Sequence, residues 1–186
     1  MRVIAGEARG RRLQEPPDKS IRPTLDRVRT ALFNMLMPEL EGATFLDLYC
    51  GTGAIGIEAL SRGASQAVFV DSAAMAQKIT RDNLFHTGLA QRARCLALNL
   101  PAELGRIPGK YDLIFADPPY DCGQHEALLE GIVACGLLAP DGALIIEHAR
   151  RQPPPEQFGT LERTRFKHYG EAALSVYRHA NDNQTV

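Results

Sequence analysis

Asp117-Pro118-Pro119-Tyr120 is the segment of this 186-residue chain with the clearest chemical meaning, because it puts an acid, two prolines and an aromatic ring at the end of an apolar run. The Asp117 carboxylate and a backbone carbonyl fixed by the prolines can accept hydrogen bonds from an exocyclic amine. Acceptors in these positions favour a pyramidal, nucleophilic amine nitrogen. The Tyr120 ring can stack on a base that has left its helix. These residues therefore predict a site that methylates an exocyclic amine.

A glycine-rich turn, Gly51-x-Gly53-x-x-Gly56, lies upstream of this segment. Glycine lets the backbone approach a ligand closely, and the N-terminus of the following helix favours an anionic group. Asp71, twenty residues after Gly51, is placed to accept hydrogen bonds from ribose hydroxyls. Adenosine with a terminal anion describes both NAD and S-adenosylmethionine. The segment 117–120 favours the second, because hydride transfer has no evident use for it.

Strands and helices alternate through the body of the chain, and they must position these residues. Runs that are apolar on both faces predict strands at 44–49, 66–71, 93–99, 111–117 and 143–148. Helical patterns between them lie at 54–62, 73–88 and 126–136. Such strands belong to a parallel sheet with helices on both faces. With 161–170 and 173–179 as a closing antiparallel pair, the predicted fold is an open, doubly wound α/β domain.

Polar residues end each of the five predicted parallel strands, namely Asp47, Asp71, Asn99, Asp117 and Glu147. In open α/β folds, ligands bind at the carboxyl ends of the strands. The polar residues therefore fall where a ligand site is expected. This coincidence is a stronger signal than any single motif.

The first 30 residues are basic, with eight basic and four acidic side chains and hence a net charge of +4, whereas the whole chain carries −1. Segment 2–13 predicts a short arm or hairpin, which we assign to an N-terminal region 1–22 ahead of a domain at 23–180 and a tail at 181–186. A basic arm on an acidic body indicates a polyanionic partner. A solvated, flexible N-terminus is the alternative.

A helical stripe of apolar residues starts at Leu25 and repeats through Leu36. Thr24 is a good N-cap for this helix, and Pro38 marks its predicted end. The helix joins the arm to the first strand.

Composition excludes several classes of protein. The four cysteines form no CxxC pair and no cluster with histidine, which argues against a disulfide framework or a metal site and for a reducing compartment. No apolar run approaches the length that spans a bilayer, and the first residues lack a signal-peptide core. We expect a cytoplasmic protein with no metal and no membrane partner.

The segments DLYCGTGAIGIEALSRGA and DPPY together resemble the class I, seven-stranded, S-adenosylmethionine-dependent methyltransferases that modify exocyclic amines. RVIAGEARGRRL, IRPTLDRVRTALFNML and the body up to about Tyr177 resemble more closely the bacterial 16S ribosomal RNA guanine-N2 methyltransferases. DPPY is shared by DNA adenine, rRNA and protein-glutamine methyltransferases, so it indicates the chemistry and not the substrate.

The resemblance implies a Rossmann-like, mostly parallel sheet with an antiparallel C-terminal strand pair, and S-adenosyl-L-methionine as the cofactor. The cofactor-binding residues that it implies are Asp47, Gly51, Gly53, Asp71, Asn99, Arg22 and Thr24. Among these, Asp71 binds the ribose and Asn99 faces the adenine. Two positions depart from the family's pattern, since Asp71 is often glutamate in relatives and Asn99 is often aspartate.

The same resemblance implies that Asp117 to Tyr120 receive the guanine amine in 16S rRNA of the small ribosomal subunit, either assembled or assembling. The implied RNA-contacting residues are Arg9, Arg11, Arg12 and Arg27. A monomer is expected.

Alternative functions remain open at the level of the sequence. A DNA adenine-N6 or protein-glutamine methyltransferase would use the same DPPY chemistry. A non-catalytic RNA-binding assembly factor would need neither the glycine loop nor DPPY intact. An NAD(P) oxidoreductase leaves DPPY unexplained.

Overall fold

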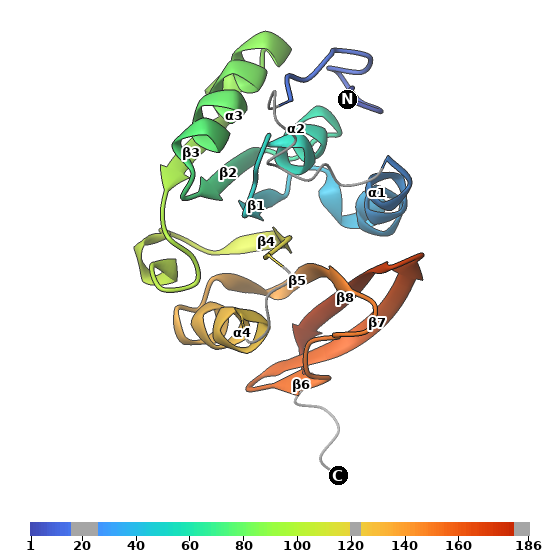
Figure 1. Cartoon of the computed structure of the whole chain (residues 1–186), viewed down its shortest axis with the longest axis vertical. Coiled ribbons are helices and arrows are strands. Elements are labelled where there is room, and N and C mark those ends of the chain that lie inside the picture. The colour runs from blue at the N-terminus through green and yellow to red at the C-terminus, as the bar shows by residue number, and fades with distance from the viewer. Residues whose placement is uncertain (16–25, 120–123, 181–186) are drawn as a thin grey trace.

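One mixed sheet forms the centre of the molecule in the computed structural model, which describes residues 1–15, 26–119 and 124–180 (Figure 1). Its strands are β1 (Thr44–Leu48), β2 (Gln66–Asp71), β3 (Ala93–Ala97), β4 (Tyr111–Ala116), β5 (Leu138–Ala149), β6 (Gln157–Phe158), β7 (Leu161–Tyr169) and β8 (Ala172–His179). Their order is β3-β2-β1-β4-β5-β8-β7-β6. The first five strands are parallel, and the last three pair antiparallel. The predicted fold class is confirmed, with the two-residue β6 as an eighth strand beyond the seven expected.

Within the described residues, four α-helices cover the sheet: α1 (Asp26–Leu40), α2 (Ala54–Ser61), α3 (Ala74–Thr87) and α4 (Gln124–Ala134). The period-two alternation of the strands divides the core between the two faces. Phe45 and Phe69 share one cluster with α1, α2 and α3, whereas Leu46 and Ile114 share the other with α4. Figure 1 shows α4 separated from α2 and α3 by the strands.

Several predicted boundaries are wrong. Strand β3 ends at Ala97 and not at 99, and α4 spans Gln124–Ala134 and not 126–136. Helix α1 does not end at Pro38 but continues to Leu40. A proline in the last turn removes only one helical hydrogen bond, and burial of Leu40 stabilises that turn. Strand β5 begins at Leu138 and not near 143, because Leu138 already pairs with Tyr111 ahead of a register shift.

The predicted N-cap Thr24 lies outside the described residues. None of the described helices has the length and apolar character that crossing a membrane requires.

Candidate functional site

The carboxyl ends of β1, β2 and β4 meet at one edge of the sheet. Leu48 at the end of β1 pairs with Val70 on one side and Ala116 on the other. The residues that follow therefore converge on a cleft of about 530 Å³. Six of the predicted site residues line this cleft: Gly51, Asp71, Asn99, Asp117, Pro118 and Pro119.

The glycine turn is held in place by Thr80 of α3. Gly53 caps the start of α2 with a φ of 74°, in the left-handed region that favours glycine. A Cβ at this position would approach Thr80 Cγ2 to 2.8 Å. The backbone oxygen of Gly51 accepts a hydrogen bond from Thr80 Oγ1 at 3.0 Å. The turn therefore keeps one shape through contacts with α3, which the sequence motif alone does not reveal.

Asp71 fastens this turn to the start of α3. Its Oδ2 accepts a hydrogen bond from the Gly51 backbone N–H at 3.0 Å, and its Oδ1 accepts one from Ala73 at 2.9 Å. Each carboxylate oxygen can accept a second hydrogen bond. The carboxylate is thus fixed by the backbone on the cleft wall, with capacity left for the hydroxyls of a bound sugar.

Asp47 lies behind the glycine turn, and it is not among the side chains that line the cleft. It is only 1% exposed, and its Oδ2 accepts a hydrogen bond from the Gly56 backbone N–H at 2.9 Å. Burial raises the pKa of Asp47 to about 7; the Gly56 hydrogen bond opposes this, and the nearby carboxylates of Asp71 and Asp117 add to it. The site therefore contains three acids, and the carboxylates of Asp71 and Asp117 raise the cost of ionising Asp47.

The remaining described walls of the cleft are formed by Asn99 and by the segment 117–119. Asn99 is exposed, and its backbone N–H donates to Glu103 Oε2 at 2.7 Å. The Asp117 N–H contacts the Leu48 carbonyl at 3.5 Å, which ties the end of β4 to the end of β1. Pro118 is buried and Pro119 is exposed. The predicted site residues Tyr120, Arg22 and Thr24 lie outside the described residues.

The charge of the cleft distinguishes between the two adenosine cofactors. Asp71 and Asp117 line it, and no lysine or arginine does so among the described residues. A dinucleotide pyrophosphate is anionic and would meet like charges, whereas S-adenosylmethionine carries a sulfonium and an ammonium group that suit carboxylates. Leu98 and Leu100 add apolar surface for a flat base. Across the described parts of the chain, no cluster of three or more metal-ligating side chains occurs.

Tyr49 is a cleft residue that sequence reasoning missed. It has a φ of 59°, a left-handed conformation that is strained for a residue with a side chain and is typical of functional sites. Its hydroxyl is buried without a hydrogen-bond partner in the described residues, and burial raises the pKa of Tyr49 to about 12. Its place between Leu48 and the glycine turn was the signal that could have identified it.

The N-terminal arm, which we define as residues 1–15, packs against α2 and α3. Arg2 and Arg12 form an isolated antiparallel bridge that closes the arm on itself. Val3, Ala8 and Leu13 are buried in the same core as α1, α2 and α3. These contacts contradict the alternative of a solvated, flexible N-terminus for residues 1–15.

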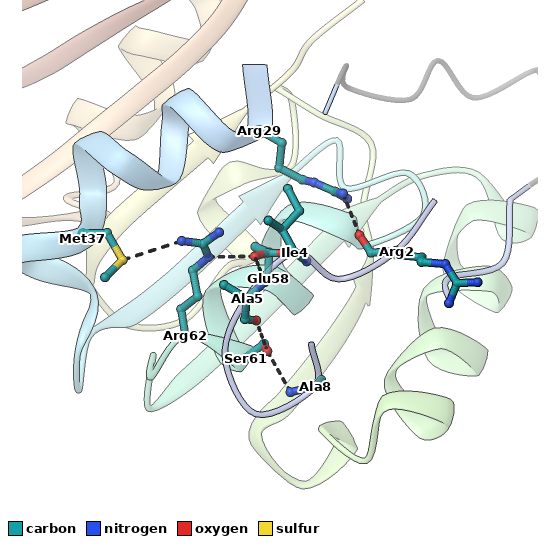
Figure 2. Close-up of polar contacts among 9 residues, drawn as sticks. All are labelled: Arg2, Ile4, Ala5, Ala8, Arg29, Met37, Glu58, Ser61 and Arg62. Atoms are coloured by element: carbon teal, nitrogen blue, oxygen red, sulfur yellow. Dashed lines mark hydrogen bonds and ion pairs between the residues drawn. The ribbon is translucent and has the colours of Figure 1, made fainter. Parts of the chain in front are cut away.

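Glu58 of α2 anchors the arm (Figure 2). This fully buried carboxylate accepts backbone hydrogen bonds from Ile4 at 2.8 Å and Ala5 at 2.9 Å. Arg62, one turn later, donates from Nε to Glu58 at 2.7 Å and lies 4.8 Å from the centre of the Phe33 ring. The negative charge is therefore paired inside the protein.

Ser61 fastens the next turn of the arm (Figure 2). Its hydroxyl donates to the Ala5 carbonyl at 2.6 Å and accepts from the Ala8 N–H at 3.0 Å. A Cβ on Gly6 would lie 1.7 Å from the Ser61 carbonyl oxygen. Only glycine fits at this point of contact.

Asn83 of α3 connects the arm to the glycine turn. Its Oδ1 accepts from the Gln14 N–H at 2.7 Å, and its Nδ2 donates to the Gln14 and Thr52 carbonyls at 3.2 and 3.0 Å. The side chain is fully buried. One amide thus contacts both the end of the arm and the loop beside the cleft.

The predicted RNA-contacting arginines differ in their surroundings. All four are exposed, and Arg11 also donates to the His86 carbonyl at the end of α3, at 2.6 Å. Arg29, which contributed to the basic charge of the first 30 residues, is fully buried and donates to the Arg2 carbonyl at 2.7 Å (Figure 2). Part of the N-terminal charge is therefore structural.

Comparisons with known proteins agree with this architecture. The family model described as "Conserved hypothetical protein 95" matches residues 1–178. The chain is 38% identical over 182 residues to the Bacillus subtilis protein named "Putative rRNA methyltransferase YlbH", covering 96% of this chain and 98% of that one. It is 32% identical over 179 residues to "Ribosomal RNA small subunit methyltransferase D" of Escherichia coli, covering 96% and 89%. The solved structure of Escherichia coli yhhF superposes with a TM-score of 0.86 at 32% identity, covering 96% of this chain and 97% of that one.

Proposed function

Because the chain belongs to the conserved hypothetical protein 95 family, we propose that it transfers a methyl group from S-adenosylmethionine to the N2 amine of a guanine in 16S rRNA. The similar small-subunit rRNA methyltransferase of Escherichia coli supports the substrate class. The observation that carries the chemistry is the position of Asp117, Pro118 and Pro119 on the wall of an acidic cleft beside the glycine turn.

The cofactor, when bound, supplies an electrophilic methyl group on a sulfonium. We assign Asp71 to its ribose, Asn99 and the apolar cleft surface to its adenine, and Gly51 and Gly53 to its methionine end. Asp47 acts from behind the glycine turn, where its hydrogen bond to Gly56 orients the first turn of α2. Arg22 and Thr24 remain predictions for the border of this pocket.

Asp117 is the catalytic residue of the proposal. Its carboxylate accepts a hydrogen bond from the guanine amine as the nitrogen becomes tetrahedral, which stabilises positive charge that develops there. The hydrogen bond of its N–H to Leu48 fixes the start of the segment relative to β1. We assign stacking of the base to Tyr120. The product loses its extra proton readily, so no dedicated base is needed.

The arm is proposed to contact RNA through Arg9 and Arg12. The N-terminal region 1–22 would thus add RNA contacts to the catalytic domain at 23–180. We further propose that the enzyme acts as a monomer in the cytoplasm, on an assembled or assembling small subunit. Light scattering of the purified chain tests the monomer, and a dimer would contradict it.

The direct test uses small subunits from cells that lack the gene, incubated with the purified chain and labelled S-adenosylmethionine. Nucleoside analysis of the 16S rRNA should show labelled N2-methylguanosine at one position. Asp117→Ala protein is the matched control. Label in N6-methyladenosine, in a protein or in no product would refute the assignment.

A further inference from the structure

A second hollow lies between α1 and the turn that joins β7 to β8. It is shallow and open to solvent, and it is lined by Arg27, Thr30, Ala31, Asn34 and Tyr169. The Arg27 side chain reaches across to the turn, because its Nη2 lies 3.6 Å from where a Cβ on Gly170 would be. We call this hollow the α1–β7 groove.

Strand register places the groove on the same edge of the sheet as the cleft. Ala116, which precedes Asp117, pairs with Ile146 of β5, and β5 continues to Ala149. Ala149 pairs with Ala172 of β8, which pairs with Tyr169 at the end of β7. An RNA strand that places a base at Asp117 and continues along this edge of the sheet therefore passes the end of β5 and then reaches the groove.

Strand β7 carries basic side chains beside the groove, although they are not among the residues that line it. Arg165, Lys167 and Tyr169 alternate along β7, so their side chains share one face. Their partners on β8 are Val176, Leu174 and Ala172, which belong to the core on the α1 side. The face of β7 that carries Arg165 and Lys167 is thus the one beside α1, and both side chains are exposed.

Positive charge in this region exceeds the negative charge that could neutralise it. Arg27, Arg165 and Lys167 form no ion pair with any residue in the described part of the chain. Arg150 and Arg151 follow the end of β5 and are exposed. The neighbouring acid, Glu171, contacts Arg151 at 4.0 Å. A polyanion is the occupant that this distribution favours.

We propose that the α1–β7 groove binds the single-stranded RNA segment next to the methylated guanine, with phosphates on Arg27, Arg165 and Lys167. The half-buried Tyr169 ring offers a base a flat surface, and the exposed Asn34 amide offers both a donor and an acceptor. This inference rests on the proposed function, since it names a second contact for the same substrate. It differs from the arm contact, which lies on α2 and α3.

The test compares two double variants that each remove two exposed positive charges. Arg27→Ala with Lys167→Ala alters the groove. Arg94→Ala with Lys110→Ala alters a hollow at the opposite edge of the sheet, beside the starts of β3 and β4. Binding of each protein to unmethylated small subunits is measured as a function of salt concentration.

The groove variant should bind about tenfold more weakly near physiological salt, and the slope of log affinity against log salt should fall by about 1 to 2. The control variant and the cofactor affinity of both should match the unaltered protein. Equal losses in the two variants would assign the effect to net charge, and no loss in either would remove the groove from the RNA interface; both outcomes overturn the proposal.

A second pair of variants tests the stacking surface. Tyr169→Ala should raise the KM for the particle about tenfold and leave the single-turnover rate at saturating particle near normal, because the lost contact lies away from the reacting atoms. Tyr169→Phe should restore the KM, since the ring remains. Competition by polyglutamate but not by single-stranded RNA would assign the groove to an acidic peptide and overturn the proposal. Binding without any methylation by the unaltered protein would refute the proposed function while leaving the groove supported.

Discussion

Two buried acids, Glu58 and Asp47, differ in how their charge is balanced. Glu58 under the arm is fully buried and has Arg62 at 2.7 Å. Asp47 under the glycine turn is also buried, but its charged neighbours are Asp71 and Asp117, and it forms no ion pair within the described residues. Burying an unpaired charge is costly, so a protein retains such an arrangement where a ligand can balance it. The charge of Glu58 is thus balanced within the fold, whereas a cationic ligand would balance a charge on Asp47.

Glu58→Ala should give the largest effect on stability, because it leaves Arg62 and two arm N–H groups without their partner. Loss of one member of a buried ion pair typically costs about 3–5 kcal/mol. We expect the free energy of unfolding to fall by about 3 kcal/mol in urea titrations, with cofactor affinity nearly unchanged. Glu130→Ala, at an exposed site on α4, is the control. A stable Glu58→Ala protein that no longer binds cofactor would contradict this role, because it would assign Glu58 to ligand binding and not to stability.

Asp117→Ala should reduce the single-turnover rate of methyl transfer about 100-fold or more, as for loss of one preorganised electrostatic contact. Its contribution belongs to the transition state, so the affinities for cofactor and particle should change little. Stability should hold or increase, because one of three neighbouring acids is removed. Asp141→Ala, which removes an exposed acid far from the cleft, provides the control. Near-normal turnover by the folded Asp117→Ala protein would leave DPPY as a structural turn.

Asp71→Ala should weaken S-adenosylmethionine binding by about 1–3 kcal/mol, measured by calorimetry, since hydrogen bonds to a charged acceptor are lost. NAD should give no binding heat with either protein. Removal of Asp71 should therefore change mainly the cofactor affinity, whereas removal of Glu58 should change mainly the free energy of unfolding. Unchanged affinity would remove Asp71 from the cofactor site.

The raised pKa of Asp47, about 7, predicts a pH dependence. Above pH 7 the group is ionised and suits a cationic ligand, so affinity should fall as the pH decreases below 7, by at most tenfold per unit. The stability of the ligand-free protein depends on pH in the opposite direction to the affinity. The folded state keeps a proton that the unfolded state releases, so this group's contribution to stability falls as the pH rises from about 4 to 7. Asp47→Asn should flatten both profiles, and a pH-independent affinity in the unaltered protein would contradict the assignment.

Arg9→Ala with Arg12→Ala should have the smallest effect. Each lost phosphate contact should reduce the salt slope of particle binding by about 1. The fold and the cofactor affinity should not change, because both side chains are exposed and the arm is held through its backbone. An unchanged salt slope would place RNA contacts elsewhere than on the arm.

The parts of the site that sequence predicted are those encoded by neighbouring residues. The strand-end acids Asp71 and Asp117 and the glycine turn follow from local pattern, and strand register then brings them together. Glu147, predicted to end its strand, lies within β5 and does not line the cleft. The anchoring of the arm was not predictable in this way. Glu58 and Arg62 are spaced like an exposed ion pair on a helix, and nothing local indicates that Glu58 accepts hydrogen bonds from residues more than 50 positions earlier. The course of α1 past Pro38 likewise depends on burial of Leu40 in the core.

Asn83 has a consequence for protein engineering. Its single amide contacts both Gln14 and Thr52. At position 6 only glycine fits, because a Cβ would clash with the Ser61 carbonyl. The arm is therefore not an exchangeable module, since a graft from a relative would need matching partners on both α2 and α3. Chimeras that aim to redirect the enzyme to another RNA should exchange the arm together with these helices, or retain the arm and vary only its exposed arginines.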